Sequence, residues 1–233
     1  MSDYGLYYWP VPFRGQFVRA LLAFAGKTWT EHDASAISDM MGARIEDMPV
    51  PFMGPPMLID KKSDFAIAEM PAVILYLAET LHLMPATAAL RALTLKIVCD
   101  ANDVLDEITL NGGRQMWTAK LWKEFIPRLT QWMSFWDETG RRHGLKAGSG
   151  FLLGGTTPGV ADVITCVLWS TMTERFPHIQ ALFQDAAPMT AALTRRLAAL
   201  APLAKLATKA RAAYGDAYCG GQIEKSLRKV LDA

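Results

Sequence analysis

The residues best suited to do chemistry lie in one stretch of the chain, residues 54–79. Pro55 and Pro56 come immediately before a short apolar run that predicts a strand, a place where cis peptide bonds occur. Pro71 then opens a predicted helix, whose first free amides could bind an anion. The stretch therefore offers two corners for a ligand, although an ordinary ββα packing unit without a ligand has the same pattern.

The elements that position these corners can be inferred from the same stretch. Met57–Asp60 and Phe65–Ala68 are short apolar runs separated by a charged break at residues 61–64, which predicts a β-hairpin. Residues 72–77 follow Pro71 without a helix breaker. Because proline fits the first position of a helix, this run predicts a helix.

The preceding residues predict a strand, a loop, a helix and a second strand. Residues 5–9 are aromatic and β-prone, and two prolines end this run. From Arg14 onward apolar residues recur at helical spacing until Gly26, and Trp29–His32 predicts the second strand. Residues 34–51 are Met-rich and irregular. The order of elements predicts a small α/β domain of about 80 residues, which we assign to residues 1–83.

After Pro85 strand signals disappear, and helix formers with a period of 3.6 residues continue almost to the end. This pattern predicts a second, all-helical domain at residues 88–233. Its expected helices cover residues 88–112, 118–140, 159–175, 179–185 and 188–200. A less regular tail follows.

Composition excludes several classes of partner. Of 233 residues, 51% are hydrophobic and 20% charged, and 24 basic against 23 acidic residues give a net charge of +1. We therefore expect a soluble globular protein that binds neither nucleic acid nor a membrane. Cys99, Cys166 and Cys219 are odd in number and widely spaced, which favours reduced thiols in the cytoplasm and no zinc site. No export signal or membrane span is expected at the N-terminus or beyond it.

Four local strings, in this order of elements, resemble the cytosolic glutathione transferases. They are Tyr-Trp-Pro-Val at residues 8–11, running without a gap to Arg19; Pro-Met-Leu-Ile-Asp at 56–60; residues 69–77; and Phe-Leu-Leu-Gly at 151–154, followed by Ala161 and Asp162. The resemblance covers nearly the whole chain. It implies a thioredoxin-like N-terminal domain, an all-α C-terminal domain and a homodimer. Within this family, the chain resembles the tyrosine-type members of the pi, mu, alpha and sigma kind. We expect a bacterial source.

The resemblance assigns the catalytic role to Tyr8. A phenol at this position can donate a hydrogen bond to the developing thiolate of glutathione and lower the pKa of the thiol. The serine and cysteine types of the family are not matched, because neither residue occurs between Ser2 and Ser35. Tyr7 should point to the opposite face of the strand. Without the resemblance, a half-buried strand aromatic is the favoured interpretation of either tyrosine.

The same resemblance places three charged residues at the tripeptide. Arg14 matches an arginine that contacts its carboxylate end, a role suited to paired donors. Glu69 matches the residue that holds the γ-glutamyl ammonium, and Glu107 an acid that reaches this group across the dimer. The alternative for Arg14 is a solvated arginine at a helix start. For Glu69 it is a carboxylate that stabilises a helix dipole, and for Glu107 a solvated acidic helix face.

Two departures weaken the expected glutathione site. Pro55, which precedes the expected cis-proline Pro56, has no N–H to offer the cysteinyl part of the tripeptide. Met70 replaces a serine or threonine whose hydroxyl binds the γ-glutamyl carboxylate, so that only the backbone amide remains. Each lost hydrogen bond costs about 1 kcal/mol. A third departure, Gly159 in place of a capping Ser or Thr, leaves Asp162 to cap its helix, a folding role.

The second-substrate site of the family is expected where aromatic and methionine side chains gather, although most of them serve helix packing. The candidates are Trp9, Val11, Met116, Trp117, Tyr214 and Tyr218. The leading hypothesis is a glutathione transferase that needs glutathione as co-substrate, needs no metal and acts on an apolar electrophile. A binding protein with a weakened glutathione site is the alternative, and peroxidase or isomerase chemistry would use the same residues.

Overall fold

The computed structural model describes residues 2–232 and begins with a four-stranded mixed sheet in the order β2-β1-β3-β4. The strands are β1 (Tyr4–Tyr7), β2 (Trp29–His32), β3 (Met57–Asp60) and β4 (Phe65–Ala68). β1 runs parallel to β2 and antiparallel to β3, and β3 and β4 form a hairpin. The predicted hairpin and second strand are confirmed with their limits. The first strand ends two residues earlier than expected.

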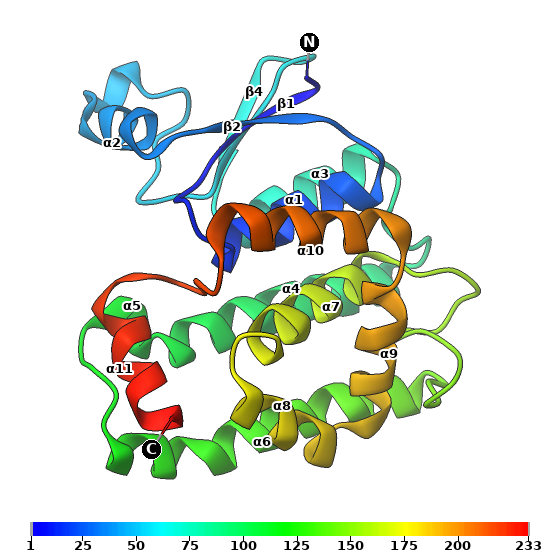
Figure 1. Cartoon of the computed structure of the whole chain (residues 1–233). Coiled ribbons are helices and arrows are strands. Elements are labelled where there is room, and N and C mark those ends of the chain that lie inside the picture. Colours follow the sequence, from blue (N-terminus) through cyan, green and yellow to red (C-terminus); the bar gives the residue numbers. More distant parts are fainter. Residues whose placement is uncertain (1, 233) are drawn as a thin grey trace.

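Helices α1 (Phe13–Phe24) and α3 (Met70–Thr80) cover one face of this sheet (Figure 1). The buried face of β1 carries Tyr4 and Leu6, which join the core residues of both helices. Between β2 and β3 the chain forms α2 (Ala34–Gly42) and the short 3-10 helix η1 (Ile45–Asp47). The irregular segment of the sequence is thus partly helical, because Asp33 caps α2 by accepting the Ala36 N–H at 2.9 Å.

The C-terminal part is all-helical, as the sequence predicts. It contains α4 (Ala88–Ile108), α5 (Leu110–Gly113), α6 (Ala119–Arg142), α7 (Val160–Thr173), α8 (Pro177–Ala186), α9 (Pro188–Ala198), α10 (Ala201–Tyr214) and α11 (Gly221–Leu231). The expectation of a single helix at residues 88–112 is wrong, because Asn111 and Gly112 have positive φ angles that break it. The tail expected to be less regular forms two helices, α10 and α11.

Helix α7 is the centre of the helical domain, since its residues are buried on nearly every side. Asp162 fixes its start. One carboxylate oxygen accepts the Gly159 N–H at 2.8 Å, and the other accepts the Leu152 N–H at 2.8 Å. The assignment of Asp162 to folding is therefore supported by its contacts.

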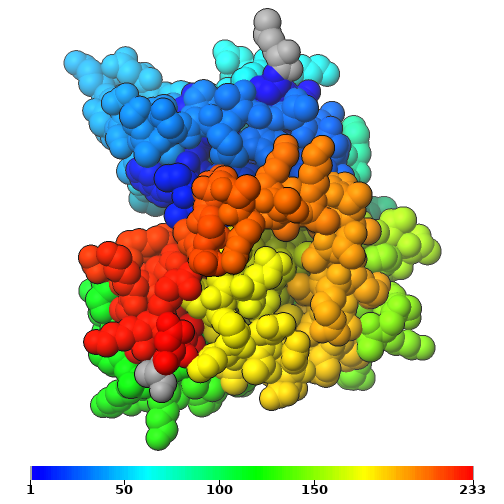
Figure 2. Space-filling view, viewed as in Figure 1, coloured from blue at the N-terminus to red at the C-terminus, as the bar shows by residue number. Residues whose placement is uncertain are grey.

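The sheet layer and the helical domain meet along α1 and α3. α1 packs against α7 and α10, and α3 packs against α4. In the space-filling view, α10 (orange) lies across the junction between the N-terminal residues (blue) and the rest of the molecule (Figure 2). Within residues 2–232, every helix is too short or too polar to cross a membrane.

Candidate functional site

Tyr8 lies just after β1, at the N-terminus of α1, and is 4% exposed. Its hydroxyl oxygen accepts the backbone N–H of Arg14 at 3.0 Å. Pro12, the residue at the N-cap of α1, provides no side-chain cap. The phenol of Tyr8 therefore supplies the acceptor that a capping side chain usually gives. Since this acceptor role uses only the oxygen, the O–H hydrogen stays free to be donated to another group.

The ring of Tyr8 is packed directly against the backbone of α1. A Cβ atom at Gly15 would lie 2.3 Å from the Tyr8 ring, so no larger residue fits there without displacing the tyrosine. The guanidinium of Arg19 lies 5.7 Å from the Tyr8 ring centre. This packing fixes where the hydroxyl points.

Burial controls the ionisation of Tyr8. Loss of hydration raises the pKa of Tyr8 to about 12, against smaller opposing effects of the Arg14 charge, the Arg14 N–H, the Arg19 charge and the Gly15 N–H. The phenol is therefore neutral at pH 7 and can act as a hydrogen-bond donor. Tyr7 lies apart from it, stacked on His32 with ring centres 3.9 Å apart, on the other face of the sheet.

Arg14 connects the two domains. Its Nε donates to the side-chain oxygen of Asn102 at 2.9 Å, and its guanidinium is paired with Asp106, both on α4. Neither partner is predictable from the sequence, because both contacts join residues that are far apart in the chain. Arg14 therefore has for a ligand only the donors that this pairing leaves free.

Pro55, Pro56 and Glu69 lie at the two corners that the sequence pointed to. The Pro55–Pro56 peptide bond is cis, as expected, and the paired strand β3 begins with the next residue. Glu69 is exposed and has φ +73°, a left-handed conformation that non-glycine residues seldom adopt. Such outliers gather at functional sites, and Glu69 sets the entry into α3.

Met70 and Glu107 both make their side-chain contacts within the described chain. The Met70 side chain is fully buried in the core of the sheet domain, so it contributes packing there. Glu107 forms an ion pair with Arg128 of α6 at 2.8 Å. Met70 could thus bind glutathione only through its backbone amide. Glu107 could bind it only if its side chain left the ion pair with Arg128.

The C-terminal segment covers the site from the helical side. Tyr218 is 1% exposed, and its ring meets Phe13 edge-on at 5.4 Å between centres. Its hydroxyl has no hydrogen-bond partner among residues 2–232, and burial raises the pKa of Tyr218 well above its ordinary value. A Cβ at Gly220 would lie 3.4 Å from Val11. The loop of residues 215–220 therefore closes on the segment between Tyr8 and α1.

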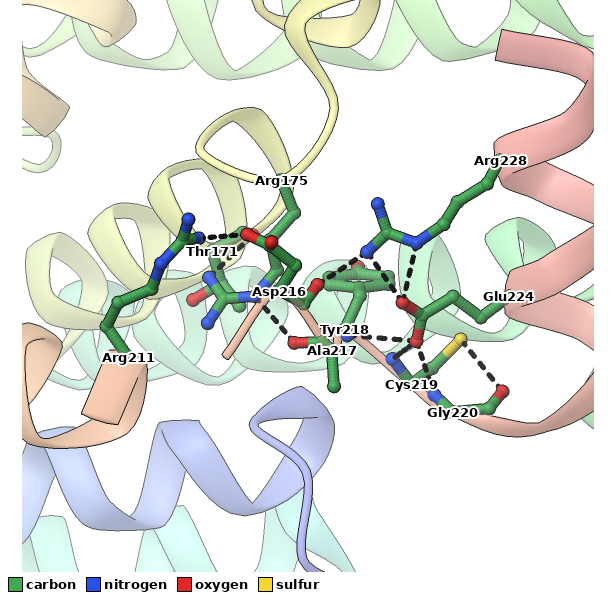
Figure 3. A network of polar contacts seen from close by, with 10 residues as sticks. All are labelled: Thr171, Arg175, Arg211, Asp216, Ala217, Tyr218, Cys219, Gly220, Glu224 and Arg228. Carbon is green, nitrogen blue, oxygen red and sulfur yellow. Dashed lines mark hydrogen bonds and ion pairs between the residues drawn. The ribbon is translucent and has the colours of Figure 1, made fainter. Parts of the chain in front are cut away.

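Glu224 holds this loop in place (Figure 3). One oxygen of its carboxylate accepts the backbone N–H groups of Tyr218, Cys219 and Gly220 at 2.9, 2.9 and 2.6 Å, while Arg228 pairs with the other. Burial acts to raise the pKa of Glu224, but these hydrogen bonds outweigh it and lower the pKa below its usual value. In sequence, Glu224 lies one position beyond the usual capping-box residue, which is why the motif was missed.

Arg175 and Arg211 hold the other end of the same loop. Arg175 donates from Nε to the Ala217 carbonyl at 2.6 Å, and Arg211 pairs with Asp216. The loop is thus anchored by Arg175, just after the end of α7, and by side chains of α10 and α11.

The remaining second-substrate candidates are not all at this site. Trp9 is partly buried and packs on the core, and Met116 is 39% exposed near Gly113. Trp117 is buried in a cluster with Trp122, and its indole donates to the Ile108 carbonyl at 2.9 Å. Tyr214 lies over the Arg19 guanidinium, 5.2 Å from it, and borders a separate cavity. Trp117 and Tyr214 therefore have other neighbours than Tyr218, which packs on Phe13.

No cluster of three or more metal-ligating side chains occurs in residues 2–232. The acceptors and donors gathered around Tyr8 are instead a phenol, backbone amides and a guanidinium. Such groups can stabilise a negative charge on a bound ligand.

The comparisons with known proteins agree with this architecture. The chain matches the model of the glutathione S-transferase C-terminal domain over residues 93–230, more than half of its length. No curated protein matches it significantly.

Solved structures with the same fold include NaGST-2 (TM-score 0.70, 20% identity), a Nu-class transferase from Haemonchus contortus (0.68, 18%) and the monomeric Na-GST-3 of the hookworm Necator americanus (0.71, 18%). Each alignment covers 89% of this chain and 97% of the other. On the match of its helical domain, this chain belongs to the glutathione S-transferase family.

Proposed function

We propose that this protein is a tyrosine-type glutathione transferase in which Tyr8 stabilises the thiolate of bound glutathione. The observation that carries the proposal is the Tyr8 hydroxyl, held by the Arg14 N–H at 3.0 Å with its own hydrogen free to donate. Because the pKa of Tyr8 is about 12, the phenol keeps this hydrogen at neutral pH. A neutral donor stabilises a nearby thiolate and so lowers the pKa of the thiol.

The proposed reaction follows from that arrangement. The glutathione thiol loses its proton to solvent, and its sulfur attacks an electrophilic carbon of the second substrate. With an aryl halide, a carbon–sulfur bond forms and halide leaves. The second substrate would lie against the wall made by Val11, Phe13 and the loop that carries Tyr218, which Glu224 fixes. Conjugation of this kind is a detoxification reaction.

Glutathione would be bound by residues 1–83, and the helical domain, residues 88–233, would hold the second substrate. We assign Pro55, Pro56 and the amide of Met70 to the tripeptide backbone, and Glu69 and Arg14 to its charged ends. Peroxidase or isomerase chemistry would use the same thiolate.

A second candidate function is supported by the tripeptide side of the site. Pro55 cannot donate a hydrogen bond, Met70 is buried, and Glu107 is paired with Arg128. Three expected contacts are thus absent or occupied. A binding protein that keeps the fold and has lost tight glutathione binding would have the same features.

We also propose a homodimer in the cytoplasm. Phe65 on β4, Leu75 on α3 and Leu95 on α4 are large exposed apolar side chains, and α3 and α4 pack together. A second copy would cover such side chains. The three cysteines are free thiols, which suits a reducing compartment.

Retention on immobilised glutathione, with free glutathione as competitor, tests the proposal against the second candidate. We expect competitive retention and conjugation of 1-chloro-2,4-dinitrobenzene, an apolar aryl halide. Absence of binding at millimolar glutathione, from a protein shown to be folded, would favour the binding protein.

A further inference from the structure

A small cavity is lined by residues of α1, α7 and α10, helices that pack at the junction of the two domains (Figure 1). Its apolar wall includes Ala20 of α1, Val167 of α7 and Leu206 of α10. The cavity volume is about 50 Å³. Since a water molecule needs about 10–15 Å³ of such space, the cavity has room for roughly three to five non-hydrogen atoms. A ligand that fits here is therefore very small.

Gln16, which lines this cavity, has an unused hydrogen-bond acceptor. Its side chain is 6% exposed, and its Oε1 atom has no hydrogen-bond partner among residues 2–232. A buried carbonyl in this state lowers stability, because it has lost its hydration without gaining a hydrogen bond. A ligand that donates a hydrogen bond to Oε1 would remove this cost.

The charged residues on the cavity wall nearly balance each other. Glu174 lies at the rim, and its carboxylate is 3.8 Å from the buried guanidinium of Arg175, a long ion pair. Arg211, also on the wall, is already paired with Asp216. Burial raises the pKa of Glu174 and lowers the pKa of Arg175, because both charges have lost hydration. A ligand with one charge of each sign suits this wall better than a simple anion or cation.

Arg175 also connects the cavity to the loop of residues 215–220 (Figure 3). Its Nε donates to the Ala217 carbonyl at 2.6 Å, and its Nη1 donates to the Thr171 carbonyl at 3.3 Å. Within residues 2–232, its Nη2 takes part in no hydrogen bond. This nitrogen is available to a carboxylate, and a ligand bound to it would restrain the side chain that holds the loop.

We propose that this cavity binds glycine or an α-amino acid of similar size, with its ammonium group at Gln16 Oε1 and its carboxylate at Arg175, and that binding makes the loop that carries Tyr218 more rigid. The zwitterion supplies the donor that Gln16 lacks and the acceptor that Arg175 lacks. It also leaves the charge of the cavity wall balanced. The site requires neither glutathione nor the Tyr8 hydroxyl, so it does not rest on the proposed transferase activity.

The test titrates the isotope-labelled full chain with glycine and follows its NMR signals. Five non-hydrogen atoms reach at most about micromolar affinity, so we expect saturation with a Kd of about 0.1–10 mM and shifts of the Gln16 side-chain amide signals. Acetate and methylammonium, which each carry one of the two charges, should bind at least about tenfold more weakly. Leucine is too large and should not bind.

Saturating glycine should also slow hydrogen exchange at residues 216–218, and glutathione should not displace it. No saturable binding at tens of millimolar glycine, equal affinity for acetate or methylammonium, or displacement by glutathione would each overturn the proposed site. Unchanged exchange in saturating glycine would overturn the proposed effect on the loop.

Substitutions locate the bound glycine. Gln16→Met removes the acceptor at nearly constant volume and should weaken glycine binding roughly tenfold or more. Ala207→Phe should fill the cavity from its exposed side and abolish binding. Ala212→Phe is the matched control, because Ala212 is likewise exposed on α10 and lies away from the cavity wall. Equal effects of the two phenylalanine variants, or full binding by Gln16→Met, would contradict the assignment.

Discussion

The helices α1 and α3 both begin at the proposed glutathione site without a side-chain cap of their own, yet their first amides differ in use. At α1 the Tyr8 hydroxyl accepts the Arg14 N–H. At α3 Met70 is apolar, and its N–H has no acceptor within residues 2–232. One helix start is thus closed by the protein, and the other is left open to an anion.

This difference separates the two halves of the proposed function. The closed end positions the hydroxyl that we propose to be catalytic, because the same contact that caps α1 directs the free hydrogen of Tyr8. The open end would offer the tripeptide the Met70 amide and the Glu69 carboxylate. Substitutions at Tyr8 and at Met70 should therefore change catalytic geometry and ligand affinity separately.

The largest effect should come from Met70→Ser, at the open end. Removal of the buried side chain should lower the free energy of unfolding by about 2–5 kcal/mol. The new hydroxyl, if it faces the open amide, should strengthen glutathione binding by about 0.5–1.5 kcal/mol. Chemical unfolding and calorimetry measure the two quantities separately.

Met70→Ala is the matched control for this substitution, since it leaves a similar cavity without the hydroxyl. Serine should bind glutathione more tightly than alanine at this position. Equal affinities would mean that the γ-glutamyl carboxylate lies elsewhere.

Tyr8→Phe should have the next largest effect, at the closed end. Conjugation at neutral pH should fall roughly tenfold to a thousandfold, about 1.4–4 kcal/mol of barrier, because the thiolate loses its donor. Raising the pH should restore part of the rate, since bulk base then forms the thiolate. Loss of the cap on α1 should also cost about 1 kcal/mol of stability.

Tyr7→Phe is the control, because its ring stacks on His32 away from α1. It should change neither the rate nor its pH dependence. If Tyr7→Phe abolished turnover while Tyr8→Phe left it intact, the assignment would be shifted by one residue. If neither changed the rate of an active enzyme, the tyrosine mechanism would be wrong.

The sequence predicts much of the fold because its signals are local. The hairpin and the second strand are bounded by charged breaks and glycine, and α7 by its acidic cap. The double role of Tyr8 is not predictable in this way, since its acceptor bond to Arg14 depends on the left-handed turn at Phe13, which has φ +26°. Helix α11 was missed because its start at Gly220 and Gly221 resembles a loop.

The candidate site is less predictable than the fold because its residues are paired over long distances. Arg14 meets Asn102 and Asp106 only when α1 packs on the helical domain. The charge of Arg14 in the sequence says nothing of these partners. Tyr214 and Tyr218 lie four residues apart, on either side of the turn at Gly215, but Tyr214 borders a cavity and Tyr218 is buried against Phe13.

A smaller effect is expected from Glu224→Gln, which tests whether the loop carrying Tyr218 supports the closed end. Loss of a charged acceptor for three amides should cost about 1–3 kcal/mol of stability. Hydrogen exchange at Tyr218 and Gly220 should become faster. Glu138→Gln, at an exposed ion-paired glutamate, is the control and should change little.

The same glutamate predicts a dependence on pH. The pKa of Glu224 in the folded protein lies below its ordinary value of 4.5, so its contribution to stability is fully present above about pH 4.5. This contribution is lost as the pH falls through the folded value. The stability difference between wild type and Glu224→Gln should therefore shrink on acidification. A difference that is constant with pH would show that the carboxylate charge does not hold the loop.

The smallest effect concerns Glu107 and depends on assembly. Sedimentation should give a homodimer at micromolar protein, twice the chain mass of 25.7 kDa. Within one chain, Glu107 pairs with Arg128 at the surface, a contact worth less than about 1 kcal/mol. A partner's tripeptide ammonium could compete for a carboxylate held so weakly. Glu107→Gln should then weaken glutathione binding slightly in the dimer, whereas Arg128→Gln, which removes the same ion pair but keeps the carboxylate, should not weaken it. Equal losses from both substitutions would show that Glu107 serves the packing of α4 on α6. A monomer in sedimentation would contradict the proposed contact of Glu107 across a dimer.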